Sequence, residues 1–304
     1  MSNQSEQTSP PPTAVIHDLG YRPYTGPRLG ERPVAWAFFV TGLRNTYGLG
    51  RSGRSKVLPM ILLGLMLLPA LILVGVLVQA GKLLELDSQI VAYSSYPLTT
   101  QLLISVFVAS QAPALISRDL RFGTITLYLA RPMRRSVYVL VRLASLTVAT
   151  FVLIGSPLVL MYLGGLLADL PFTRETERFL GGMVGALLLA ACLAGLSAVV
   201  AALTVRRGLA VAAVIVVLLV SYTVVATIQG ISYDADQRDV GEIAGLFSPY
   251  TLVNGVQYFL FDSPRATPTP PRSTGMGIAY VATTVLTVLG CIGVLLARFR
   301  RVRP

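Results

Sequence analysis

The chain has 304 residues, of which 54% are apolar and only 13% are charged, whereas charged residues make up about 25% of an ordinary soluble domain. This composition excludes a soluble enzyme and a disordered chain. The formal net charge is nevertheless +11, and an apolar chain with a basic surplus is typical of membrane spans with basic flanks. Nucleic-acid binding would account for the basic residues but not for the apolar excess, so we expect no nucleic-acid partner.

Residues 1–32 form the first predicted segment, a cytoplasmic tail. It begins rich in Ser, Gln and Pro and continues with aromatic and basic residues between His17 and Arg28. A terminal segment of this kind is normally solvated, although its aromatic and basic residues could bind a partner. His17 is the chain's single histidine, and no cysteine lies near it in the sequence, so we expect no metal site.

Residues 33–56 predict a helix in the inner headgroup layer, followed by a basic bend. Pro33 suits the first turn of a helix. Helices of this type, with Trp on one face and Arg residues beside it, lie in the plane of the membrane surface. The apolar residues that recur at three- and four-residue steps are Trp36, Phe39, Val40, Leu43 and Tyr47.

The basic bend contains a glycine pattern that resembles two phosphate-binding motifs. Residues 48–53 match GxGxxG, and residues 48–55 nearly match the phosphate loop, with Arg54 in place of its Lys. Both motifs bind phosphate only between a strand and a helix. Here a surface helix precedes and a membrane span follows, so we interpret the segment as a flexible bend. We expect that the chain is not an enzyme and hydrolyses no nucleotide itself.

Residues 57–304 form the predicted membrane domain, an all-α fold with six transmembrane helices. A helix needs about 20 apolar residues to cross a bilayer, and stretches without Asp, Glu, Lys or Arg reach that length. We expect the third helix to begin near Ser136 and Arg142 to extend toward the headgroups. Cys192 and Cys291 lie inside such stretches and are interpreted as buried thiols. The charge-free stretches are 57–79, 97–117, 143–168, 180–205, 208–228 and 274–297.

The basic residues predict the orientation of these spans. Six spans divide the connecting segments into two sets, and the set that includes both termini holds 19 of the 25 Lys and Arg residues. That set carries a net charge of +15 and the other set −4. Because basic loops stay on the inner side of the membrane, both termini are predicted to be cytoplasmic.

The outer loop 229–273 predicts helices that enter the membrane without crossing it. It opens with acidic residues and continues with the apolar run 246–261. That run is too short and too broken to cross twice, so we expect one or two re-entrant helices. A linker rich in Thr and Pro, residues 264–272, leads to the last span.

The span interiors contain no acidic or basic residue, although ion-coupled transporters commonly place such residues there. Energy for transport would therefore have to come from a partner. Polar side chains remain as candidates for a substrate path, and we single out Gln101, Ser105, Gln111, Tyr222 and Thr223.

The fourth span also carries small residues at every fourth position, which predicts close packing against another helix. These residues are Gly182, Ala186, Ala190, Ala194, Ala198 and Ala202.

The segment after the second span resembles a known coupling element. Its residues Arg118-Asp119-Leu120-Arg121-Phe122-Gly123-Thr124, followed by Leu129-Ala130-Arg131-Pro132, are similar to the cytoplasmic coupling helix of permease subunits of type-2 ABC transporters. The six spans, the surface helix and the outer loop with Ser-Pro-Tyr agree with that family. Residues 17–30 and 47–56 are also similar to permeases common in actinobacteria. Many relatives have Glu where Asp119 stands.

This resemblance implies a permease subunit of an ATP-driven transporter of the exporter kind, in a bacterial plasma membrane. Segment 118–135 would dock on a separate ATPase, present in two copies, which would hold the ATP and Mg; the chain itself would carry no cofactor. A second copy or a paralogous permease would complete the complex among the membrane lipids. The residues implied to contact the ATPase are Arg118, Asp119 and Arg121 as polar contacts, Phe122, Leu127 and Leu129 as apolar anchors, and Gly123, Thr124 and Arg131.

An amphipathic or lipid-like substrate suits an apolar path with scattered hydroxyls, and export is the usual direction in this family. The alternative function is that of a channel or structural membrane anchor that works without a partner.

Overall fold

The computed structural model describes residue 26 and residues 30–50, 53–81, 93–116, 133–204 and 206–300. Every regular element in these ranges is a helix, as the composition predicted. The helices are α1 (Glu31–Thr46), α2 (Gly53–Gly81), α3 (Tyr96–Thr99), α4 (Gln101–Leu115), α7 (Arg135–Leu167), α8 (Phe172–Leu203), α9 (Arg207–Asp234), α10 (Arg238–Ala244), the 3-10 helix η2 (Gly245–Phe247), α11 (Pro249–Phe261) and α12 (Thr274–Arg300).

Five of these helices are long and apolar enough to cross a membrane, namely α2, α7, α8, α9 and α12. The chain is therefore a multi-pass α-helical membrane protein. The second predicted span, 97–117, is instead occupied by α3 and the 15-residue α4. At 1.5 Å per residue α4 is about 22 Å long, less than the roughly 30 Å of a bilayer's hydrocarbon core. The sixth crossing stays a prediction.

The long helices extend beyond the charge-free stretches. Helix α7 begins at Arg135, next to the expected start, and its 33 residues make it about 50 Å long. Helix α8 begins at Phe172 rather than near residue 180, so Glu175 lies inside the helix. A helix ends where its backbone hydrogen bonds end, and it does not stop at the membrane boundary. Charge-free windows therefore underestimate helix length.

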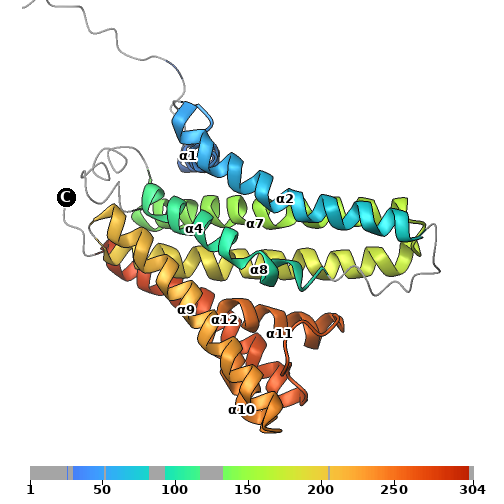
Figure 1. The fold of residues 1–304 in the computed structure, drawn as a ribbon. Helices are drawn as coiled ribbons and strands as arrows, with labels where there is room; N and C mark the ends of the chain where they lie inside the picture. Colours follow the sequence, from blue (N-terminus) through green and yellow to red (C-terminus); the bar gives the residue numbers. More distant parts are fainter. Residues whose placement is uncertain are drawn as a thin grey trace, which may run out of the picture.

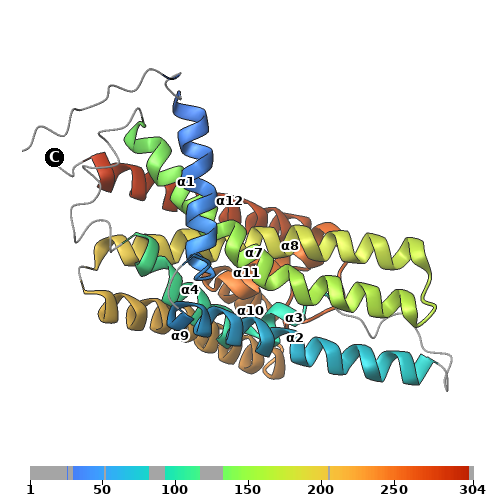
Figure 2. The ribbon, with the colours of Figure 1, turned by 90° about the horizontal axis from the view of Figure 1, so that it is seen from above.

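Helices α7 and α8 lie side by side at the centre of the molecule (Figures 1 and 2). Helix α2 covers α7 on one side, and α11 and α12 pack against α8 on the other (Figure 1). The small residues of α8 are the reason for this close packing: all six residues of the predicted stripe are buried. A Cβ on Gly182 would lie 2.8 Å from the Cβ of Tyr93, and one on Gly185 would overlap the Gln257 side chain. The packing function predicted for the stripe is confirmed.

Proline residues lie inside two of the long helices, α2 and α7, and a tyrosine donates a hydrogen bond close to one of them. Pro69 of α2 removes one backbone hydrogen bond, because proline has no N–H. In the same turn, the hydroxyl of Tyr96 donates to the carbonyl of Met66. Such side-chain donors supply hydrogen bonds that the membrane interior cannot.

Helix α1 packs along the first half of α7. The ring of Phe38 lies 5.3 Å from that of Tyr138, and the Tyr47 hydroxyl donates to the carbonyl of Ala149 over 2.7 Å. The predicted apolar face is divided: Tyr47 is buried and Leu43 packs against the core, whereas Trp36 is 67% exposed. The sequence pattern located an apolar side of the helix, but it did not indicate which apolar residues meet α7.

The bend after α1 has the backbone that its glycines predict. Gly48 and Gly50 adopt φ values of +68° and +82°, which glycine tolerates far better than other residues. A helix precedes the bend and a helix follows it, so the strand that a phosphate loop requires does not precede the glycines. The interpretation as a bend is therefore supported.

The ends of α1, α7 and α12 meet at one end of the bundle, called the inner end below because its basic residues are predicted to face the cytoplasm. The backbone N–H of Arg134 donates to Glu31 over 3.1 Å. Nη1 of Arg135 donates to the carbonyl of Arg300 over 3.3 Å. At the far end of α9, where α12 begins, the predicted loop 229–273 contains α10, η2 and α11, which together form the outer cap (Figure 1). Its helices are confirmed, and their depth in a membrane stays a prediction.

Candidate functional site

Of the predicted coupling segment 118–135, residues 118–132 lie outside the described residues, and the residues on either side of this stretch are described. All nine residues implied to contact an ATPase fall between residues 117 and 132. Ile116 on one flank and Met133 on the other are buried in the same apolar cluster. Phe299 of α12 and Ala198 of α8 belong to that cluster too. Both ends of the segment are therefore held by one packed body at the inner end.

Three of the five predicted path residues meet around Tyr250, at the start of α11. The Tyr250 hydroxyl lies 2.7 Å from the Ser105 hydroxyl and donates to the carbonyl of Gln101 over 3.1 Å. A tyrosine hydroxyl has one proton, so Ser105 must be the donor in the first bond. The ring of Tyr222 stands edge-on to that of Tyr250, with centroids 6.0 Å apart. We call Gln101, Ser105, Tyr222 and Tyr250 the Tyr250 cluster.

The other two predicted path residues lie elsewhere. Gln111 is buried further along α4, where its Nε2 donates to the Ser110 hydroxyl over 3.1 Å. Thr223 is exposed on α9, and its carbonyl accepts a hydrogen bond from the Thr227 hydroxyl. Thr223 lies next to Tyr222 in sequence but on another face of the helix, since neighbouring residues are about 100° apart around the axis. The set does not form one continuous polar path.

Helix α11 has a polar face that the sequence analysis missed. Tyr250, Asn254 and Gln257 recur at steps of four and three and are all buried. Nδ2 of Asn254 lies 3.3 Å from the carbonyl of Ser94, and Nε2 of Gln257 lies 3.5 Å from that of Gly181. Helical spacing is the signal in the sequence that points to this face, but the apolar residues between these three make the segment as a whole apolar.

The opposite side of α11 packs against α12 through glycines. A Cβ on Gly255 would overlap the ring of Tyr280, and a Cβ on Gly277 would overlap the ring of Phe259. Polar contacts to α8 and to the residues around α4, together with close ring contacts to α12, fix α11 from several directions. The outer cap is therefore part of the same packed body as the spans that it covers.

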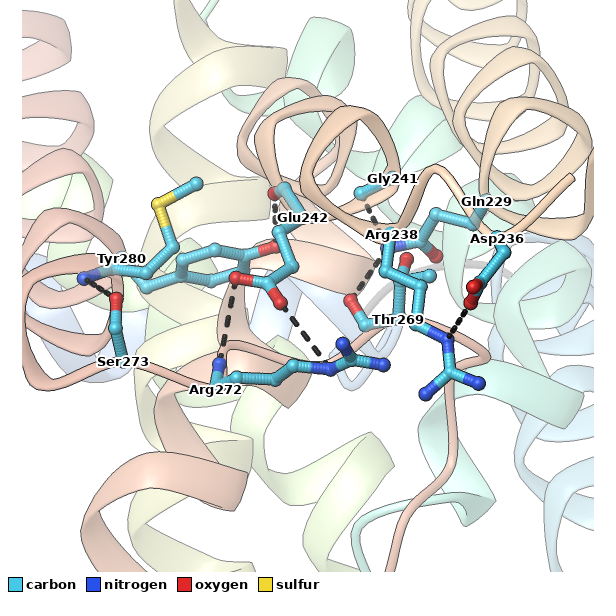
Figure 3. A network of polar contacts seen from close by, with 10 residues as sticks. Gln229, Asp236, Arg238, Gly241, Glu242, Thr269, Arg272, Ser273 and Tyr280 are labelled. Carbon is cyan, nitrogen blue, oxygen red and sulfur yellow. Dashed lines mark hydrogen bonds and ion pairs between the residues drawn. The ribbon is translucent and has the colours of Figure 1, made fainter. Parts of the chain in front are cut away.

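Glu242 of α10 is a buried acid at the base of the outer cap (Figure 3). Its carboxylate lies 3.6 Å from Nε of Arg272 and 3.5 Å from the backbone nitrogen of Arg272. Its carbonyl accepts a 2.6 Å hydrogen bond from the Tyr280 hydroxyl. These contacts tie α10 to the linker before α12 and to α12 itself.

Gln229 joins α9 to the same network. Its Nε2 donates to the carbonyl of Gly241 over 3.2 Å and lies 3.5 Å from that of Thr269 (Figure 3). Gly241 lies so close to Ser232 and Thr269 that a Cβ would overlap the Ser232 hydroxyl. The outer cap is thus connected by polar contacts to the end of α9, to the linker and to α12.

Arg142 corrects one expectation. The sequence predicted that this side chain would extend toward the headgroups, yet it is only 6% exposed. Its guanidinium lies 4.2 Å from the ring centre of Phe38 and 5.7 Å from that of Tyr138. Helix α1 covers this part of α7, and the cation–π contacts stabilise the buried charge. The sequence could not show that a distant helix covers the arginine.

Glu175 is a second buried charge inside a long helix. It is fully buried, accepts a 3.0 Å hydrogen bond from the Tyr93 hydroxyl and lies 3.5 Å from Nη1 of Arg178. Burial and the neighbouring negative charge of Glu175 both raise the pKa of Tyr93, so its hydroxyl stays protonated and donates. The first turn of a helix also stabilises an acid there. We interpret the group as a structural ion pair at the outer end.

Within the described residues no group of His, Cys, Asp and Glu side chains is placed to hold a metal ion. Cys192 and Cys291 are buried free thiols, which agrees with their predicted packing role. No protein-family model matches the chain, and no curated protein matches it.

Removal of the Tyr250 hydroxyl should destabilise the outer cap. We expect Tyr250→Phe to lower the free energy of unfolding by about 1–3 kcal/mol, because buried polar groups on α4 lose a partner. Thermal melting in detergent measures this change. Tyr258→Phe on the same helix is the matched control, since the half-buried Tyr258 hydroxyl has no hydrogen bond among the described residues. Equal melting of the two variants would show that the Tyr250 cluster contributes nothing.

Proposed function

We propose that the chain is the membrane-spanning permease subunit of an ATP-driven ABC transporter that exports an amphipathic or lipid-like substrate. A separate ATPase subunit in two copies would supply the energy, and a second permease copy or a paralogue would complete the translocation path. The proposal combines the resemblance of residues 118–135 with the architecture around them. In this scheme both termini face the cytoplasm of a bacterial cell, and the chain spans its plasma membrane.

The observation that carries the proposal is the packing at both flanks of segment 117–132. Ile116 at the end of α4 and Met133 before α7 belong to one buried cluster with residues of α8 and α12. A protein that pushes on the segment would therefore act on four helices at once, because packed interiors transmit displacement rather than absorb it. A loop with loosely packed ends would move without displacing the helices.

Helix α4 connects the segment to the outer cap. Ile116 at its inner end leads into the segment, and Gln101 and Ser105 at its outer end hydrogen-bond Tyr250 of α11. A shift of α4 along its axis would therefore displace the outer cap. A rigid helix that contacts different partners at its two ends can carry coupling between distant sites.

Purification from native membranes tests the proposal. We expect the chain to retain an ATPase subunit, and we expect the ATPase activity of that complex to respond to amphipathic compounds. The alternative, a partner-independent channel or anchor, predicts a chain that purifies alone. Passage of a solute across liposomes that contain only this polypeptide, without nucleotide, would overturn the proposal.

A further inference from the structure

An open apolar groove lies between α1 and the start of α7, on the side of α1 that does not contact Arg142. Its volume is about 480 Å³. Each helix contributes residues spaced three or four apart, so the two helix faces form its two walls. The lining residues are Arg32, Ala35, Trp36 and Phe39 of α1 and Val137, Leu140, Val141 and Ala144 of α7.

The groove lies at the level of the inner headgroups in the predicted orientation. Helix α7 is about 50 Å long, which exceeds a hydrocarbon core of about 30 Å, and the groove occupies its first turns, between Val137 and Ala144. Trp36 is 67% exposed and stacks on Phe39 with ring centroids 5.5 Å apart. Exposed Trp side chains of this kind are enriched where hydrocarbon meets headgroups.

The charge at the mouth of the groove is positive. Arg32 is the charged residue of the lining, it is exposed, and no acid pairs with it among the described residues. Glu31 beside it is already engaged by the backbone N–H of Arg134, at 3.1 Å, and by the Arg134 side chain, at 4.0 Å. An anionic group at Arg32 would therefore meet a cation that its neighbours do not neutralise.

We propose that this groove binds one anionic phospholipid of the inner leaflet, with an acyl chain along the apolar walls and the phosphate on Arg32. A soluble anion would match Arg32 but leave the walls of Trp36, Phe39 and Leu140 facing water. A zwitterionic lipid would cover the walls and bring a phosphate, but its own ammonium would compete with Arg32 for that phosphate. A phospholipid with net negative charge satisfies both. This site goes beyond the proposed transport function and does not depend on it.

Bound lipid would fix α1 against α7 from the open side. On the other side the Phe38 ring already contacts Arg142, and the Ser145 hydroxyl lies 3.1 Å from the carbonyl of Phe39. No side chain from the described part of the chain fills the groove between the two helices. Occupancy of the groove would therefore link the position of α1 to the lipid composition of the inner leaflet.

Trp36, the chain's single tryptophan, reports directly on the groove. The purified full-length protein is reconstituted in nanodiscs that contain phosphatidylglycerol or phosphatidylcholine with brominated acyl chains, and quenching of Trp36 fluorescence is measured. We expect stronger and saturable quenching by the brominated phosphatidylglycerol, and we expect high salt to weaken the difference. Glycerophosphate, which has no acyl chains, should not displace the brominated lipid.

Two variants locate the effect. Arg32→Gln should reduce quenching by phosphatidylglycerol to the level seen with phosphatidylcholine, and Ala144→Phe should fill the groove and reduce it likewise. Ala144 is exposed, so the larger side chain meets no packed core. Arg44→Gln is the control, because Arg44 is an exposed arginine of the same helix that does not line the groove. Equal quenching by both lipids, or equal effects of Arg32→Gln and Arg44→Gln, would overturn the proposal. A separate protein that protects Trp36 from both lipids would overturn it too.

Discussion

Asp119→Arg should abolish the stimulation of the partner ATPase while the protein still inserts into the membrane. The change places a positive charge where the resemblance implies a negative one, at a contact between subunits. Removal of one partner from a close charge pair at an interface commonly costs about 2–5 kcal/mol, which corresponds to at least roughly 30-fold in affinity. ATPase activity and substrate export by the purified complex measure the effect.

Asp119→Glu is the matched control for this experiment. It keeps the charge and introduces the residue common at this position in the permeases that the segment resembles, so we expect stimulation close to that of the unaltered protein. Met133→Leu is a second control, because it replaces a buried apolar residue beside the segment with one of similar volume. Unchanged ATPase stimulation and export in Asp119→Arg would contradict the assignment of this segment.

Glu242→Gln should open the linker before α12. The variant keeps the shape of the side chain but replaces one carboxylate oxygen by an NH2 group and removes the charge. The two carboxylate oxygens contact Nε and the backbone nitrogen of Arg272, both of which are donors, so one of these contacts is lost. Loss of such a contact at a buried site costs about 1–3 kcal/mol. Because each 1.4 kcal/mol is a factor of ten in an equilibrium, the open population should rise about 5- to 140-fold. Trypsin cleavage at Arg265 and Arg272 in the linker measures that population.

Asp236→Asn is the control because it removes the acid of the other ion pair in the same network (Figure 3). Asp236 lies 3.2 Å from Nε of Arg238, but its side chain is 86% exposed, against 6% for Glu242. Exposed pairs contribute about 0–1 kcal/mol, so we expect almost unchanged cleavage. Similar cleavage rates for the two variants would show that burial of Glu242 does not hold the linker.

The helical class of the protein and most of its long helices could be predicted from the sequence. Insertion of a segment into the bilayer depends on its own apolar composition and lack of charge. Each membrane helix can therefore be predicted without knowledge of the others. Even so, the windows placed Glu175 outside the fourth span, whereas α8 includes it. They also predicted a full crossing at 97–117, where the described helix α4 has 15 residues.

The site could be predicted only in part. Gln101, Ser105 and Tyr222 were found because polar residues are few in an apolar chain. Their meeting point was not found, because Tyr250 is far from them in sequence and belongs to a segment that reads as apolar. The same criterion predicts Thr223, which the helix turns to another face.

The amino-acid sequence by itself determined that the chain resides in a membrane, which segments are helical and where charge accumulates, because these properties depend on local composition and on the bilayer as solvent. The tertiary structure decided which charges are buried and what they meet. Arg142 lies beneath α1 and Glu242 is tied to Arg272 because helices distant in sequence pack there. Packing of that kind depends on the shapes of both surfaces at once, and no single segment contains that information.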